Sequence, residues 1–214
     1  MNKEMNSPKK SLLAPLALLL VALAGCNVVP PAQEDATRYF VLSDPAASAH
    51  GVALPSGTLR IGLKSVVLEG YLKHREMIVR TGQNEVAFRD YRRWAESLDT
   101  AISRIVQATI QASPGVAEVG AEPFPFEQKR DFDVSIRILK CEGAESSSGK
   151  FTASFSAMIE ISTTGDGAHV VARRLFVAPP EAWDGANFDR LAALLSMDAA
   201  ALGRDVVAGI PARD

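Results

Sequence analysis

The chain has 214 residues, of which 47% are apolar and 22% are charged, so it can build a packed core as a soluble domain does. Its formal net charge of −2 provides no basic surface of the kind that nucleic-acid-binding proteins use, which argues against nucleic acid as a partner. The length fits one domain that follows a short N-terminal segment.

The first 26 residues have the layout of an export signal. Lys3, Lys9 and Lys10 form a positive head, and an apolar run of about a dozen residues follows from Leu12 to Leu23. That run is shorter than the roughly 20 residues that a membrane-spanning helix needs. A buried N-terminal helix would not explain why the head, the apolar run and the small residues occur in this order. We therefore predict that residues 1–25 are a cleaved signal peptide.

The cysteine that closes this segment separates it from an ordinary secretory signal. Leu23-Ala24-Gly25-Cys26 resembles the lipobox of bacterial lipoproteins. The resemblance implies that the Cys26 thiol receives a diacylglycerol, that cleavage makes Cys26 the new N-terminus, and that this terminus is N-acylated, for instance with palmitate. Several acyl chains on one residue form a stable membrane anchor, whereas a single chain binds only marginally.

The residue after Cys26 bears on which membrane holds the anchor. Aspartate at this position resembles the inner-membrane retention signal of Gram-negative lipoproteins, and here the residue is Asn27. We therefore expect the protein on the periplasmic face of the outer membrane. Residues 26–37 contain a proline pair and little periodicity, which is typical of a tether. About eleven residues span at most roughly 40 Å.

Strand patterns precede the first helix pattern. Residues 38–42 form a short apolar strand, and residues 58–68 alternate apolar and polar side chains as a half-buried strand does. Residues 77–80 and 85–88 flank a short turn that contains glycine, which predicts a β-hairpin.

Two amphipathic helices are predicted, the first over about residues 91–112 and the second over about residues 187–207. Apolar residues recur on both at helical spacing, among them Leu98, Ile102, Ile105, Phe188, Leu191, Leu195 and Leu202. On each helix these residues form an apolar face, which a surface helix typically packs against a sheet.

Three longer strand patterns lie between the helices, at residues 131–139, 150–162 and 169–178, and short turns rich in Ser, Gly and Asp join them. Such consecutive strands predict an antiparallel meander. The order of strands and helices predicts an α+β fold, a two-layer sandwich in which a mixed, mostly antiparallel sheet carries two amphipathic helices on one face. We expect residues 38–214 to form this single domain.

No motif for catalysis, a metal or a nucleotide is present. The three histidines are isolated in the sequence, and HExxH, CxxC, Gly-x-Ser-x-Gly and phosphate-loop patterns are absent. With Cys26 acylated, Cys141 is the remaining thiol, so no disulfide can form within the chain. Cys141 is expected to pack as a small apolar residue. We expect no enzymatic activity and no cofactor besides the lipid on Cys26.

Residues 71–98 resemble the ABC-type transport auxiliary lipoproteins, the family that includes paraquat-inducible protein C. The shared features are a Tyr-Leu pair, an Ile-Val-x-Arg-like tract, a hairpin and an Arg-Trp-Ala-Glu-x-Leu entry into a helix. They fall here on Tyr71, Leu72, Ile78, Val79, Arg80, Arg93, Trp94, Ala95, Glu96 and Leu98. The chain has Lys-His-Arg-Glu at 73–76, where the family tends to carry an Asp-Arg-Pro-like run.

The resemblance implies a function that composition could not show. Lipoproteins of this family accompany ABC transporters that carry lipid between the inner and outer membranes through a periplasmic protein with mammalian-cell-entry domains. The chain would be the outer-membrane end of this system and would bind that periplasmic protein. A structural or assembly lipoprotein of another outer-membrane complex is the alternative, and self-association into a homo-oligomer also stays open.

Aromatic residues and arginine often anchor interfaces, and on this ground we predict Tyr71, Leu72 and Arg75 as the partner-binding residues. Trp94 has two interpretations. It either lies in the core at the end of the first helix stripe, which we favour, or it belongs to the same surface patch. The sequence alone does not separate these, because an amphipathic patch looks the same against the core and against a partner.

Overall fold

The computed structural model describes residues 34–43, 57–125 and 127–211. Residues Thr37–Asp214 form one compact unit. Its elements in chain order are β1 (Arg38–Phe40), β2 (Leu59–Leu63), β3 (Val67–Leu68), the 3-10 helix η2 (Gly70–Lys73), β4 (Glu76–Arg80), β5 (Val86–Trp94), α2 (Leu98–Gln111), β6 (Val116–Ala121), β7 (Phe132–Glu145), β8 (Phe151–Thr163), β9 (Val170–Val177), β10 (Glu181–Trp183) and α3 (Phe188–Ala208). The predicted signal peptide, Cys26 and most of the predicted tether lie outside the described residues.

A long hairpin of β7 and β8 is the centre of the sheet. The two strands pair antiparallel along their length, from Phe132 opposite Thr163 to Glu145 opposite Phe151. β9 pairs antiparallel with the other edge of β8, and β10 continues along that edge where β9 ends. The antiparallel meander predicted from the sequence is thus present.

The opposite edge of β7 holds three separate strands in succession. β2, β3 and β4 all run parallel to β7, through residues 61–63, 67–68 and 79–80. β6 joins β2 on its outer side, whereas β5 and then β1 join β4. The ten strands of the described residues therefore form one mixed sheet, with its parallel pairs on this side of β7.

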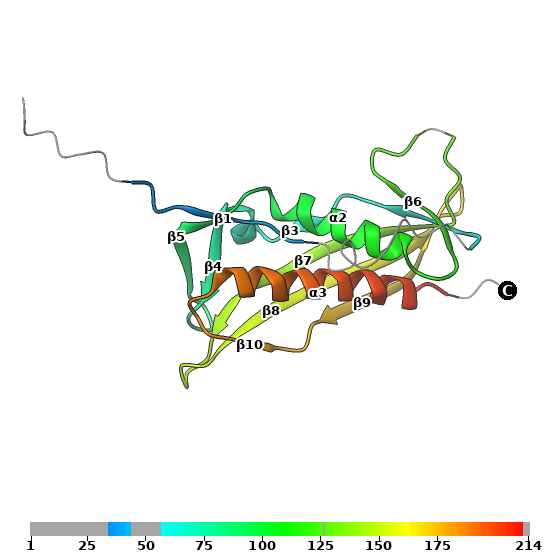
Figure 1. Ribbon diagram of the computed structural model, residues 1–214. Helices are drawn as coiled ribbons and strands as arrows, with labels where there is room; N and C mark the ends of the chain where they lie inside the picture. Colours follow the sequence, from blue (N-terminus) through cyan, green and yellow to red (C-terminus); the bar gives the residue numbers. More distant parts are fainter. Residues whose placement is uncertain (1–33, 44–56, 126, 212–214) are drawn as a thin grey trace, which may run out of the picture. The chain divides into compact units, whose positions relative to one another are not determined.

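Both helices lie side by side on one face of the sheet (Figure 1). The core between the two layers contains Val134, Ile136, Phe155 and Ile159 from the hairpin and Ile102, Ile105, Leu195 and Leu202 from the helices. Cys141 is also buried there with a free thiol, as predicted. This arrangement confirms the α+β two-layer sandwich. No helix in the described part of the chain is long and apolar enough to span a membrane.

The two helices approach each other closely at Gly203. A Cβ atom at this position would lie 2.8 Å from the Cβ of Thr109 on α2, well inside the distance that real side chains keep. A larger residue at position 203 would therefore force α2 and α3 apart.

The first helix begins at Leu98 rather than near Tyr91. Residues 91–94 belong to β5, and Arg92, Arg93 and Trp94 pair with β1. Ser97 precedes the helix in an extended conformation, and Asp99 lies in the first turn. These are the start signals of a helix, and pairing with β1 overrides the apolar periodicity that continues before them.

Two irregularities explain why strand boundaries differ from the prediction. The strand expected at 58–68 is split into β2 and β3, because the N–H and Oγ of Ser65 both bind the Glu122 carboxylate at 3.1 Å. β7 continues past Leu139, where the predicted strand ends. A bulge at Leu139 shifts by one residue which side chains face the helices, and this shift interrupts the alternation on which the prediction was based. The sequence pattern does not predict β6, β10 and η2.

Ile105→Asp is expected to unfold the domain. Ile105 is fully buried on α2, and an unpaired carboxylate there costs several kcal/mol, comparable to the whole stability of a domain. Arg104→Asp is the control, because it removes a half-exposed ion pair with Glu96 and a hydrogen bond to the Leu42 carbonyl, each worth about 1 kcal/mol. Thermal melts followed by circular dichroism should lose the transition in the first variant alone. Equal losses would mean that α2 faces the sheet with another side.

Candidate functional site

The predicted partner-binding residues lie in the loop between β3 and β4, where η2 forms one short turn. This turn places neighbouring side chains in different environments. Leu72 is 1% exposed and packs in the core, so the prediction that it lies on the binding surface is wrong. Lys73, His74 and Arg75 follow it directly and are exposed. Leu72 is therefore a core residue within a loop whose composition is mostly polar.

Tyr71 fastens this loop to the sheet. Its hydroxyl donates a hydrogen bond of 3.0 Å to the carbonyl oxygen of Leu139, the residue at which β7 bulges. A bulged residue lacks a partner in the ladder, so the tyrosine hydroxyl supplies the hydrogen bond that the neighbouring strand does not. The ring of Tyr71 also lies 5.6 Å from the guanidinium of Arg80. Most of the side chain is thus used within the fold.

Next to Tyr71 lies an ion pair with a buried carboxylate, which the sequence pattern did not indicate. Arg80 Nε donates to Glu142 Oε1 at 2.6 Å, and the Glu142 side chain is fully buried. Burial, and secondly the Glu142 carboxylate, raise the pKa of Tyr71 to about 12, because both disfavour the phenolate. The two partners are 62 residues apart in the sequence, and no local pattern indicates such a pair.

Arg75 is the predicted residue whose side chain is exposed. Its backbone carbonyl accepts the N–H of Trp94 at 2.7 Å, which holds the loop against the end of β5. The neighbouring His74 ring packs edge-on against Phe88, with the ring centroids 5.0 Å apart. The backbone is therefore held in place while the Arg75 guanidinium faces solvent. Binding of a partner by Arg75 stays a prediction.

Trp94 belongs to the core. Its side chain is 3% exposed, and it lies opposite Phe40 in the parallel register of β1 and β5. This confirms the interpretation that we favoured from the sequence, and it removes Trp94 from the set of surface anchors.

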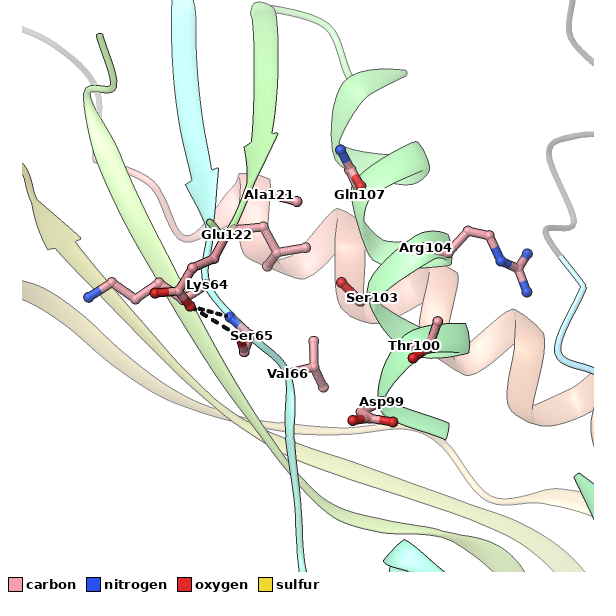
Figure 2. A pocket seen from close by; sticks show the side chains of 11 residues that line it. Lys64, Ser65, Val66, Asp99, Thr100, Ser103, Arg104, Gln107, Ala121 and Glu122 are labelled. Atoms are coloured by element: carbon pink, nitrogen blue, oxygen red, sulfur yellow. Dashed lines mark hydrogen bonds between the residues drawn. The ribbon is translucent and has the colours of Figure 1, made fainter. Parts of the chain in front are cut away.

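Two adjoining hollows follow α2 from this loop. One of about 450 Å³ lies between the loop and the start of α2, and one of about 360 Å³ lies between the β2–β3 connection and α2 (Figure 2). Val66 and Asp99 line both, so the two hollows adjoin, and we call them together the α2 groove. Its other polar and charged lining residues are Lys64, Ser65, Lys73, His74, Arg75, Glu96, Ser97, Thr100, Ser103, Arg104, Gln107 and Glu122.

The α2 groove carries hydroxyls and charges of both signs rather than a reactive cluster. In the part of the chain that the structure describes, no three His, Cys, Asp or Glu side chains are grouped to hold a metal ion. Burial raises the pKa of the Cys141 thiol above its usual range, so this residue is a poor nucleophile. A groove of mixed polarity suits a protein partner, because protein interfaces combine a polar rim with a few residues that contribute most of the binding energy.

Tyr71→Phe tests the fastening of the loop. Loss of the bond to the Leu139 carbonyl should lower the free energy of unfolding by about 1 kcal/mol and leave the fold unchanged. In the folded protein the pKa of Tyr71 is raised above its ordinary value of 10.0, so the folded state favours the neutral phenol. The stability gained in this way is fully present below pH 10.0 and is lost as the pH rises through about 12.

A spectrophotometric titration of the folded protein checks this assignment. The chain has three tyrosines, and ionisation of one of them should appear only near pH 12 and be absent in the Tyr71→Phe variant. A late step that persists in the variant would show that the raised pKa belongs to another tyrosine.

Comparison with known proteins agrees with the fold. The family model for the ABC-type transport auxiliary lipoprotein component matches residues 40–207. Protein XCC0632 from Xanthomonas campestris, assigned to DUF330, is 15% identical with a TM-score of 0.61, over 80% of this chain and 89% of its own. The crystal structure of an uncharacterized protein is 14% identical with a TM-score of 0.58, over 80% of this chain and 97% of its own.

No curated protein matches the chain in sequence. The two structural likenesses establish the fold alone, because their sequence identities are low. The family match extends from β1 to the last turn of α3 and so includes the whole sandwich. The chain therefore belongs to the ABC-type transport auxiliary lipoprotein family.

Proposed function

We propose that the protein is a non-catalytic lipoprotein on the periplasmic face of the outer membrane, where it docks the mammalian-cell-entry protein of a lipid-transporting ABC system. The family match over residues 40–207 carries the proposal, because this family is an auxiliary component of ABC-type transport. The lipobox-like sequence that ends at Cys26 supports it, since acyl chains at that residue would anchor the domain.

A docking role, rather than a lipid-carrier role, is supported by how the sandwich is filled. Large side chains with less than 2% exposure occupy the space between sheet and helices, among them Ile61, Ile102, Ile105, Ile136, Ile138, Phe155 and Ile159. The α2 groove has charged and hydroxyl side chains among its apolar lining residues, and these polar groups would lose their hydration against an acyl chain. A protein surface can instead pair with them.

Arg75 is the anchor residue that we assign to this docking surface. It lies where the loop meets the α2 groove, and its backbone is held by the hydrogen bond from Trp94. A held backbone reduces the ordering cost that binding must overcome. A guanidinium can pair with a carboxylate in a bidentate way, which gives orientation as well as affinity.

Arg75→Glu should weaken binding of the cognate mammalian-cell-entry protein on the order of tenfold, the effect of removing one interface anchor. The thermal melt should not change, because the Arg75 side chain is exposed. A pull-down with the purified periplasmic protein measures the loss. Arg204→Glu, the same change at an exposed position on α3, is the matched control. Equal weakening by both variants would assign the effect to net charge, and no binding by the parent chain would reject this docking partner.

Cys26→Ser should abolish acylation and release a folded domain from the membrane. The reason is that serine lacks the thiol that accepts the diacylglycerol, while position 26 precedes the whole sandwich. Metabolic labelling with a palmitate analogue, followed by separation of inner and outer membranes, measures both effects. Label in the inner-membrane fraction of the parent would contradict the outer-membrane assignment, and label retained by the variant would contradict lipidation at Cys26.

A further inference from the structure

The segment at the start of the sandwich presents apolar side chains to solvent. Tyr39 and Val41 are 58% and 49% exposed, whereas the alternating Phe40 and Leu42 are buried. Phe40 packs against the Phe188 ring of α3, with the ring centroids 6.3 Å apart. The inward residues therefore fix the segment on the core, and the outward ones are held in place on the surface.

The exposed residues border a hollow of about 580 Å³ between β1 and α3. Ala193 and the exposed Met197 form its wall on α3. Its serine groups are bonded within the protein: Ser43 N–H donates to Ser196 Oγ, which donates to the Ala192 carbonyl. Arg38 and Asp189 supply the charged part of the lining. The hollow is otherwise a mainly apolar surface at the outer edge of the sheet.

Charged and aromatic groups surround this hollow. Arg38 and Arg92 lie opposite each other in register, with their guanidiniums about 6.0 Å and 5.9 Å from the rings of Phe40 and Phe188. They share a second hollow, of about 450 Å³, with Asp184 and Asp189. Two cations beside two anions match a zwitterionic phospholipid head group, which carries a phosphate and an amine.

Tyr91 borders a third hollow that Arg92 also lines, and its side chain is 59% exposed. Tyrosine and tryptophan are the residues enriched where proteins meet the head-group layer, because one end is apolar and the other is polar. Arginine can likewise lay its apolar stem on lipid and keep its charge in water.

The position of this surface along the chain favours the membrane as its binding partner. β1 starts at Arg38, directly after the tether that leads from Cys26. A tether of about eleven residues reaches at most roughly 40 Å. Residues 38–41 are therefore the part of the sandwich nearest along the chain to the acyl chains of an anchored protein.

We propose that this surface, made by Arg38, Tyr39, Val41, Tyr91, Arg92 and Met197 and here called the β1 surface, contacts the phospholipid head groups of the membrane that holds the protein. The inference rests on the proposed lipidation of Cys26. The acyl chains alone would attach the protein only at its N-terminus. Contact through the β1 surface gives it a second attachment and one orientation.

A second exposed apolar area provides an internal comparison. Leu175 and Val177 on β9 are 59% and 62% exposed. They lie near the end of the meander, 135 residues or more after the end of β1 at Phe40. They match Tyr39 and Val41 in exposure but have no tether beside them in sequence, so their replacement tests whether any exposed apolar pair would bind lipid.

The test uses the mature chain with Cys26→Ser, so that binding reports the protein surface and not the acyl anchor. We expect this chain to float with phosphatidylcholine vesicles. Replacing Tyr39 and Val41 together by Ser should lower the partition coefficient on the order of tenfold, and replacing Leu175 and Val177 by Ser should change it by less than about twofold. Circular dichroism melts establish that both variants are folded.

Failure of the parent chain to bind vesicles would overturn the proposal, as would equal losses in the two double variants. If the Tyr39 and Val41 replacements instead abolished self-association or binding of the periplasmic protein, with no vesicle binding by the parent, the β1 surface would be a protein interface and the proposal would be wrong. The vesicle assay does not involve Arg75 or the periplasmic protein, so its failure is distinguishable from failure of the docking function.

Discussion

The pairing of β7 with β8 is the constraint on which the rest of the structure depends. One edge of this hairpin binds β9 and β10, the other binds β2, β3 and β4, and one face carries both helices. A slip of one residue in this register would turn Val134, Ile136 and Ile138 away from the helices. The burial of that row therefore selects one register, and each of the outer strands then has a defined place.

The bulge at Leu139 connects the central hairpin to the candidate site. Before the bulge Ile138 is buried opposite Ala157, and after it Cys141 is buried opposite Phe155. The extra residue leaves a carbonyl that Tyr71 satisfies. The loop that presents Arg75 is thus fastened to the central hairpin itself.

Periodicity predicted the elements whose burial repeats without interruption. α3 and the meander follow single periods of 3.6 and 2, and their predicted positions agree with the structure to within a few residues, apart from the part of β7 beyond Leu139. It failed where a contact distant in sequence decides the outcome. Residues 91–94 become strand because β1 pairs with them, and β2 ends because Glu122 binds Ser65. Neither partner can be recognised from the local sequence.

The candidate site shows the same division within one loop. Sequence reasoning treated the residues of this loop alike, whereas a single turn of 3-10 helix sends Leu72 into the core and leaves Arg75 exposed. This division would suit the docking surface that we propose. A contact residue on a mobile loop would have to be ordered at each binding event, and that ordering lowers affinity. Leu72, packed in the core, and Tyr71, bonded to the Leu139 carbonyl, hold this loop against the sandwich.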